Sequence, residues 1–178
     1  MSKEVDKMIF RKAEKEDFDK ARFLYWTLID REQEDPSFPH WKKGIHPSDE
    51  MIRNSIDKEE MYVLADGDEI AACVIANDEK VDGYADAPWQ IDSEEVIVLH
   101  VLAVHLDYRG RGLARTLVEN VIELERKAGK KALRLDVIEN NTTAEKLYQK
   151  LGFQYIQTKT LYYDVVGEMT FKLYELVL

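Results

Sequence analysis

The stretch from Glu95 to Val104 is the strongest constraint on the fold, because it is almost continuously apolar. A run of this kind predicts a strand that is buried on both faces, at the centre of a sheet. The strand leads into a turn with two glycines, and after the turn apolar residues recur at helical spacing from Leu113. A buried strand, a tight turn and a helix in this order predict a mixed α/β domain.

The remaining elements follow from the same kinds of pattern. Runs rich in β-branched and aromatic residues predict further strands at 9–13, 61–65, 69–75, 133–137, 153–163 and 169–177, the last two joined near 164–167. Helical spacing predicts helices at 17–29, around 51–56 with Ser48 as N-cap, from 113 to near 129, and at 143–151. Stretches 32–44 and 77–93 are predicted loops. With no linker or repeat in the pattern, we expect one domain spanning 1–178.

The composition excludes several classes of protein. The 178 residues are 45% hydrophobic, which suits a globular domain, and a formal net charge of −10 argues against a nucleic-acid surface. Cys73 is the single cysteine, so we expect neither a disulfide framework nor a metal site. No apolar run approaches the roughly 20 residues that cross a bilayer. The N-terminal segment is charged, unlike a secretory signal, so the cytoplasm is the simplest location.

The glycine-rich turn, 108–115, has the features of an anion site. Gly110 and Gly112 let the backbone curl tightly and approach a ligand without obstruction by a Cβ atom. The helix that follows presents backbone N–H groups and the positive end of its dipole, and three arginines add charge. A diphosphate fits such a site, whereas a solvated connection is the alternative. The third glycine of a dinucleotide-binding turn and the Gly-Lys-Ser/Thr of a Walker loop are absent.

Two segments resemble the motifs of the GNAT acetyltransferases. Segment 102–114, LAVHLDYRGRGLA, resembles the coenzyme A motif Arg/Gln-x-x-Gly-x-Gly/Ala, with Arg109, Gly112 and Ala114 at its defining positions. Segment 141–153, NTTAEKLYQKLGF, resembles the family's Asn-x-x-Ala, Tyr, Gly-Phe segment. The resemblance implies the GNAT fold of class α/β, with a central mixed, mostly antiparallel sheet of about seven strands. This sheet should be splayed at its two middle strands and flanked by about four helices.

The resemblance also implies acetyl-CoA as the cofactor, with coenzyme A as a product. The pantetheine arm should follow the strand that ends at Val104, bonded to backbone groups of Leu102 and Val104, and an amide near Leu102 should stabilise the oxyanion. Asn141 should hydrogen-bond the same arm. The expected cofactor-binding residues are Leu102, Ala103, Val104, Arg109, Gly110, Arg111, Gly112, Leu113, Ala114, Arg115, Asn141, Ala144 and Tyr148.

The implied enzyme is an N-acetyltransferase in which an amine attacks the thioester directly. Tyr148 matches the tyrosine that protonates the departing sulfur in the family, and packing of the helix on the sheet is the alternative role. His100 is the first candidate for the base, because it lies two residues before Leu102 on a regular strand and titrates near neutral pH. A buried neutral histidine is the alternative reading of His100, and Glu94 and Glu95 are alternative bases.

The resemblance implies that the acetyl acceptor is a primary amine of a small molecule, amino acid or peptide. Trp26, Trp41, Trp89 and His100 are candidate substrate-binding residues, because aromatic rings beside carboxylates hold cations. A hydrophobic lid or a dimer contact is the alternative for the aromatic residues. A homodimer is the default assembly, and neither a nucleic acid nor a membrane is an expected partner. A non-catalytic acyl-CoA-binding sensor with the same fold is the competing function.

Overall fold

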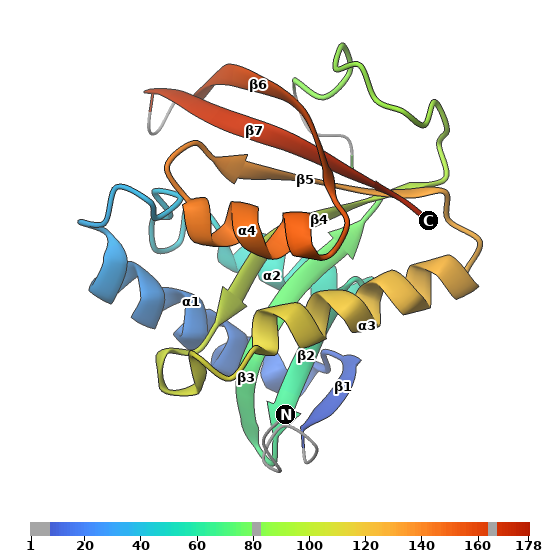
Figure 1. Cartoon of the computed structure of the whole chain (residues 1–178). Coiled ribbons are helices and arrows are strands. Elements are labelled where there is room, and N and C mark those ends of the chain that lie inside the picture. The colour runs from blue at the N-terminus through green and yellow to red at the C-terminus, as the bar shows by residue number, and fades with distance from the viewer. Residues whose placement is uncertain (1–7, 80–82, 164–166) are drawn as a thin grey trace. The chain divides into compact units, whose positions relative to one another are not determined.

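The computed structural model of the chain describes residues 8–79, 83–163 and 167–178 (Figure 1). Its elements are β1 (Ile9–Lys12), α1 (Phe18–Glu32), α2 (Asp49–Asp57), β2 (Met61–Asp66), β3 (Glu69–Asn77), β4 (Val96–Val104), α3 (Leu113–Lys127), β5 (Ala132–Ile138), α4 (Thr142–Lys150), β6 (Gln154–Tyr163) and β7 (Gly167–Val177). Short 3-10 turns, η2 (Lys15–Asp17) and η3 (Leu106–Tyr108), precede α1 and α3. Every predicted helix and strand is confirmed, with small shifts at the ends. Three segments lie outside the described residues: the charged N-terminal segment 1–7, residues 80–82 of the predicted 77–93 loop, and residues 164–166 between the last two strands.

The strands form one mixed sheet in the order β1-β2-β3-β4-β5-β7-β6. The pairs β1/β2, β2/β3, β5/β7 and β6/β7 are antiparallel, and β4/β5 is parallel. The expected mixed, mostly antiparallel sheet with seven strands and four α-helices is therefore confirmed for the described residues. Val96–Val98 pair with Ala132–Arg134, near the amino-terminal ends of β4 and β5. The splay of these two strands stays a prediction.

The chain divides into two compact units. The first unit contains β1, α1, α2, β2, most of β3, the second half of β4 from His100, and α3 as far as Val121. The second contains 34–40, 77–99 and the chain from Ile122 to Leu178, with β5, α4, β6 and β7. The prediction of a single domain over 1–178 stays a prediction.

The core of the first unit is built on α1 and the β2–β3 hairpin. The residues of α1 that are buried recur at helical spacing and form one face: Phe18, Ala21, Leu24, Tyr25, Leu28 and Ile29. Met61–Ala65 of β2 is buried throughout, and so is β3 after its first residue. The predicted N-cap of α2 is confirmed, because the Ser48 hydroxyl accepts a hydrogen bond of 3.0 Å from the Met51 N–H.

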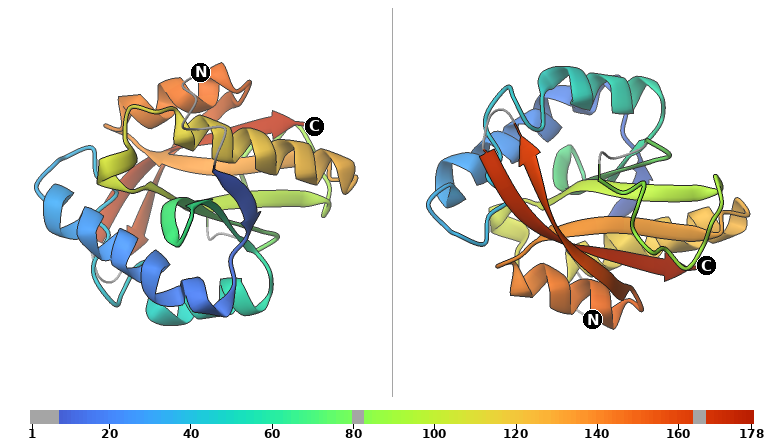
Figure 2. Two further views of the ribbon diagram at one scale, coloured as in Figure 1. Left: turned by 90° about the horizontal axis from the view of Figure 1, so that it is seen from below. Right: turned by 90° about the horizontal axis from the view of Figure 1, so that it is seen from above.

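The second unit is built on β5, α4 and the long hairpin of β6 and β7, which Figure 2 shows as a strongly twisted pair. Leu133 and Leu135 of β5 and Leu173 and Tyr174 of β7 are almost fully buried. The Glu145 carboxylate ties α4 to β7, since it accepts hydrogen bonds of 2.9 Å from both Lys172 Nζ and the Tyr174 hydroxyl. These contacts fix the position of α4, which carries the second motif.

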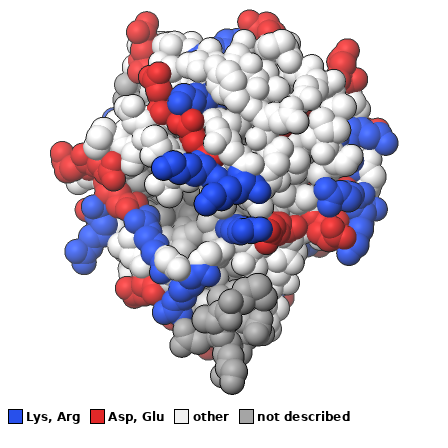
Figure 3. Space-filling model, in the orientation of Figure 1, with Lys and Arg blue, Asp and Glu red and all other residues white. Residues whose placement is uncertain are grey.

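The surface charge is unevenly distributed. The chain carries a formal net charge of −10, yet Lys and Arg side chains gather near the middle of the face drawn in Figure 3. A local concentration of positive charge in an acidic protein indicates a place where an anion can bind. Within the described part of the chain, no helix has the length and apolar character needed to span a membrane.

Candidate functional site

The second half of β4, which carries His100 and Leu102, departs from a regular buried strand. Val96–Leu99 are buried, whereas His100, Val101, Leu102 and Val104 are only partly buried. Val101 has a φ of 47°, which is rare for a β-branched residue and locally costly. The irregularity falls where the cofactor arm is expected to lie. Because Val101 lies between His100 and Leu102, these two side chains need not lie on the same face of β4. The prediction that His100 is the base assumed a regular strand and is therefore weakened.

Tyr25 of α1 holds the irregular part of β4 in place. Its side chain is fully buried, and its hydroxyl donates a hydrogen bond of 2.8 Å to the Val101 carbonyl oxygen. Burial, with a smaller contribution from Cys73, raises the pKa of Tyr25 well above its usual value, so the phenol keeps the proton that it donates to Val101. The Trp41 ring packs edge-on against Tyr25, 5.5 Å between centroids. Tyr25 therefore stabilises the backbone of β4 at its strained residue.

Replacing Tyr25 with Phe is expected to lower the free energy of unfolding by about 1–3 kcal/mol, because the partly buried Val101 carbonyl loses its partner. Chemical denaturation of the wild type and the variant measures this difference. Tyr162→Phe is the control, since that side chain is 71% exposed and its change should have almost no effect. Equal stability of Tyr25→Phe and the control would show that the hydrogen bond does not hold the strand.

The loop between η3 and α3 has the backbone geometry of an anion site. Gly110 and Gly112 have φ values of 75° and 78°, in the left-handed region that favours glycine. Among the described residues, and apart from the glycine and its two neighbours in the chain, no atom lies within 4 Å of the position that a Cβ would occupy at either residue, so both are open to a ligand. The Gly112 carbonyl accepts the first helical bond, from Thr116 N at 3.1 Å, which makes Gly112 the N-cap of α3. The next N–H groups point out of the helix end, where a phosphate can bind.

The three arginines of the loop are exposed, and each contacts another group of the chain. Arg109 donates through both terminal nitrogens to the Glu32 carboxylate, at 2.7 Å to Oε2. Arg115 donates to Glu119 at 2.8 Å, and the Arg111 guanidinium lies over the Tyr108 ring, 5.0 Å from its centroid. These are surface contacts, which are individually weak. A diphosphate could replace them, so the residues present fit the pyrophosphate of coenzyme A.

The second motif begins α4. Asn141 is the N-cap, because its Oδ1 accepts a hydrogen bond of 3.0 Å from Ala144 N. Because Oδ1 already accepts this capping hydrogen bond, Asn141 would contact a cofactor chiefly as a donor, through its side-chain nitrogen. Tyr148 is 7% exposed and packs edge-on against Phe153, 5.5 Å between centroids. Burial and then the charge of Asp136 raise the pKa of Tyr148, so its phenol is protonated at all physiological pH values.

Asp136 is a titratable group that the sequence patterns did not single out. It lies on β5, where burial raises the pKa of its carboxyl group. The Tyr84 hydroxyl donates a hydrogen bond of 2.8 Å to Asp136 Oδ2, which partly offsets this effect by favouring the charged form. A carboxyl group with a raised pKa beside a protonated tyrosine is a typical acid–base arrangement. The one available signal was an acidic residue inside the apolar run of β5.

The other candidate bases, His100, Glu94 and Glu95, have different environments. His100 is partly buried in the first unit. Glu94 borders a cavity in the second unit, and Glu95 lies 3.9 Å from Lys131 Nζ on the exposed surface. Asp136 and Tyr148 both belong to the second unit and interact electrostatically. Asp136 is therefore better supported as a base than Glu94 or Glu95, while the role of His100 stays a prediction.

The three candidate tryptophans have different environments. Trp41 is 9% exposed and packs against Tyr25, which fits the alternative of a hydrophobic lid rather than a substrate wall. Trp26 is partly buried, and Arg22 and Lys43 lie over its ring at 5.0 and 5.5 Å from the centroid. Trp89 lines the cavity that Glu94 borders, so it is the tryptophan best placed to contact a ligand.

Known sequences are similar to parts of this chain. The [ribosomal protein bS18]-alanine N-acetyltransferase of Escherichia coli is 35% identical over 74 residues, 42% of this chain and 49% of the relative. An uncharacterized N-acetyltransferase of Methanocaldococcus jannaschii is 35% identical over 71 residues, 39% of this chain and 31% of the relative. The chain therefore spans less than half of the length of these relatives.

Solved structures share the fold over nearly the whole chain. A GNAT-family acetyltransferase from Streptococcus agalactiae has a TM-score of 0.78 at 24% identity, covering 96% of this chain and 95% of the other. The yncA protein of Salmonella typhimurium, solved with its cofactor acetyl-CoA, has a TM-score of 0.71 at 17% identity, covering 97% and 94%. The model of the acetyltransferase (GNAT) family matches residues 16–153, well over half of the sequence. The expected GNAT fold is thus confirmed, and the chain belongs to the acetyltransferase (GNAT) family.

Proposed function

We propose that this protein transfers the acetyl group of acetyl-CoA to a primary amine, by direct attack and without a covalent enzyme intermediate. The family uses acetyl-CoA as the donor, which supports the choice of cofactor. The observation that carries the proposal is the loop before α3, where two glycines with positive φ, a helix N-terminus and three arginines form a site for a diphosphate.

The phosphate loop and β4 bind the donor. Arg109, Arg111 and Arg115 exchange their surface contacts for phosphate oxygens, which form shorter and stronger charge-assisted bonds. The backbone of Gly110–Ala114 supplies further N–H donors. Backbone groups of Leu102–Val104 bind the pantetheine arm, and an amide near Leu102 stabilises the oxyanion. Asn141 donates to the arm from the start of α4, with Ala144 beside it.

Asp136 acts as the general base and Tyr148 as the general acid. The amine nitrogen forms a bond to the acetyl carbon while the bond between that carbon and sulfur breaks. Asp136 in its ionised form takes the proton that the amine loses, directly or through water, and Tyr148 gives its proton to the departing sulfur. The raised pKa of the Asp136 carboxyl makes it a stronger base than an exposed aspartate, which supports this role.

The acceptor class includes small amines, amino acids and peptide N-termini. The similarity to a ribosomal-protein alanine N-acetyltransferase of E. coli keeps a peptide N-terminus within the class. A homodimer and a cytoplasmic location belong to the same proposal. The competing function, an acyl-CoA sensor without catalysis, would bind the donor and never release a thiol.

Replacing Arg109 and Arg111 with Ala tests the donor site. The double variant should bind acetyl-CoA at least tenfold more weakly, because each charged hydrogen bond contributes about 1.5–3 kcal/mol. Its affinity for acetyl-pantetheine, which lacks the diphosphate, should hardly change. Glu32→Gln should have the opposite effect and bind acetyl-CoA more tightly, because it weakens the competitor for Arg109. Calorimetric titration measures all of these affinities.

The control for this experiment is Arg126→Ala, at the other end of α3, where the side chain pairs only with Glu123 at 3.4 Å among the contacts described for it. Titration with ATP and a thiol-release assay over a panel of amines complete the test. Tighter binding of ATP than of acetyl-CoA would contradict the proposed cofactor. Binding of acetyl-CoA without thiol release for any amine would favour the sensor.

A further inference from the structure

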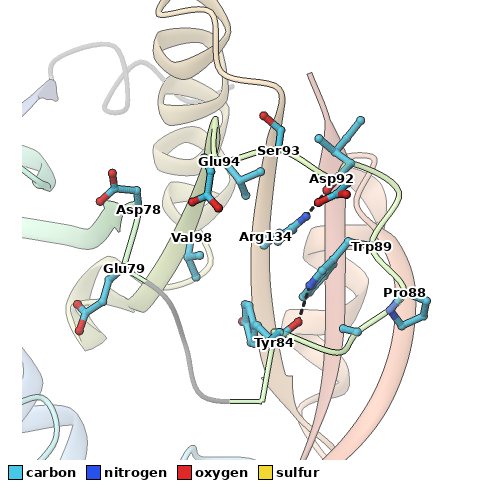
Figure 4. A pocket seen from close by; sticks show the side chains of 14 residues that line it. Asp78, Glu79, Tyr84, Pro88, Trp89, Asp92, Ser93, Glu94, Val98 and Arg134 are labelled. Atoms are coloured by element: carbon cyan, nitrogen blue, oxygen red, sulfur yellow. Dashed lines mark hydrogen bonds between the residues drawn. The ribbon is translucent and has the colours of Figure 1, made fainter.

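A cavity of about 520 Å³ lies in the second unit, lined by Asp78 and Glu79, by residues between Tyr84 and Glu94, and by residues of β4 and β5. Figure 4 shows Asp78 and Glu79 on one side of this cavity and Trp89 with Arg134 on the other, with Val98 and Glu94 between them. A cavity of this volume is within the range that holds a small organic molecule.

The floor of the cavity is apolar and firmly built. Val98 and Tyr84 are buried and form one core cluster with Leu173, against which the Trp89 ring packs. Trp89 makes two contacts with Tyr84: its Nε1 donates to the Tyr84 carbonyl at 2.8 Å, and the two ring centroids lie 5.1 Å apart. A rigid floor with an aromatic wall suits the alkyl part of a ligand and offers a ring face to a cation.

The rim of the cavity is acidic. Four carboxylates line it, and all four side chains belong to exposed residues: Asp78, Glu79, Asp92 and Glu94. Arg134 is the one basic residue among those lining it. Its guanidinium already pairs with the fully buried Glu175 at 2.9 Å and donates to the Ile91 carbonyl, so its charge is largely compensated. Arg134 also lies over the Trp89 ring, 4.3 Å from its centroid, so one face of this ring already carries a cation. Among the described lining residues, acidic side chains therefore outnumber basic ones, which favours a positively charged ligand.

One side chain, Tyr84, contacts both the cavity and Asp136, the proposed base. Tyr84 lines the cavity, and its hydroxyl donates to Asp136 at 2.8 Å. Arg134 and Asp136 are two residues apart on β5, so they share one face of the strand at a separation of about 7 Å. Asp136 itself does not line the cavity, so a ligand that reaches from the cavity to Asp136 has to pass the Tyr84 side chain.

We propose that this cavity binds a second positive charge of the acetyl acceptor, so that the preferred acceptor is an alkyl diamine or a longer polyamine. One amine loses its proton to Asp136 and is acetylated, and the other stays protonated among Asp78, Glu79 and the rest of the rim. The proposal rests on the proposed function for the acetylation step, while the binding of a cation in the cavity stands on its own geometry.

The test compares two amines with the same six-carbon chain, 1,6-diaminohexane and hexylamine, as acceptors for acetyl-CoA. In a thiol-release assay the diamine should have a kcat/KM at least about tenfold higher, since it adds contacts to carboxylates and to Trp89. The advantage should shrink at high salt, because the rim is exposed and screened. In Asp78→Asn/Glu79→Gln the ratio of the two kcat/KM values should fall below about threefold.

The matched control is Asp68→Asn/Glu69→Gln, which removes a neighbouring Asp–Glu pair at the β2–β3 turn and should keep the full preference for the diamine. Equal kcat/KM for the two amines, or a peptide N-terminus used better than the diamine, would overturn the inference and leave acetyl transfer intact. If no amine releases the thiol, calorimetry with 1,6-diaminohexane decides the inference separately. Binding lost in Asp78→Asn/Glu79→Gln would support the cation site, and absence of binding to the wild type would overturn it.

Discussion

Asp136→Asn is expected to lower kcat/KM by about 10²- to 10⁴-fold, the range that a general base contributes. An amide cannot accept the proton that the attacking amine loses, but it has the same shape and can still accept the hydrogen bond from the Tyr84 hydroxyl. The loss should therefore appear in turnover, with the affinity for acetyl-CoA nearly unchanged. Thiol release and calorimetric titration measure the two quantities.

The same variant should be more stable than the wild type at neutral pH. Burial raises the pKa of Asp136 above its unfolded value, so between these two values the native state binds more protons than the unfolded state. The contribution of Asp136 to the free energy of unfolding then falls as the pH rises through its folded pKa, and it is least favourable near neutral pH. Asn removes this dependence, so the free energy of unfolding, measured by denaturation at several pH values from about 4 upward, should vary less with pH in the variant than in the wild type.

The pH dependence of activity shows whether Asp136 acts as a base or only packs in the core. In the wild type, kcat/KM should fall as the pH decreases through the raised pKa of Asp136, because only the ionised form is a base. Tyr84→Phe removes the hydrogen bond that favours ionisation, so this acidic limb should move to higher pH. Glu139→Gln, an exposed residue just after β5, is the control. Near-normal turnover of Asp136→Asn would make His100 the leading candidate again.

The elements around the site could be predicted because their signals are local. β4 and α4 were expected at 95–104 and 143–151 and are observed at Val96–Val104 and Thr142–Lys150. A continuous apolar run, a helical period and capping residues such as Ser48 act over a few residues, so they can be recognised without knowledge of the tertiary fold. The glycine loop belongs to this group, since a positive φ strongly favours glycine.

The chemistry inside the fold could not be predicted in the same way. The hydrogen bond between Tyr84 and Asp136 joins residues 52 positions apart, and it sets the ionisation of a carboxyl group that the sequence shows only as one acidic residue in a strand. The positive φ of Val101 is equally hidden, because the strand pattern predicts extended backbone and Tyr25 from α1 stabilises the exception. Both features depend on tertiary contacts, which override local preferences.

Tyr148→Phe is expected to lower kcat by about 10²- to 10⁴-fold and to leave the affinity for acetyl-CoA within about twofold. Phe fills the same volume against Phe153, so the packing of α4 should be retained. A tyrosine that only packs would tolerate this change, and unchanged turnover would therefore remove its role as the acid. Tyr155→Phe, at a half-exposed tyrosine in the same unit, is the control.

The double variant Asp136→Asn/Tyr148→Phe tests whether the two residues act in one step. The charge of Asp136 raises the pKa of Tyr148, so the base must be ionised while the acid still holds its proton, and each state favours the other. If both protons move as the thioester is cleaved, either single change removes most of the catalysis. The double variant should then be little slower than the slower single variant, because residues that act as a unit have non-additive effects. Losses that multiply would instead assign the two residues to separate steps.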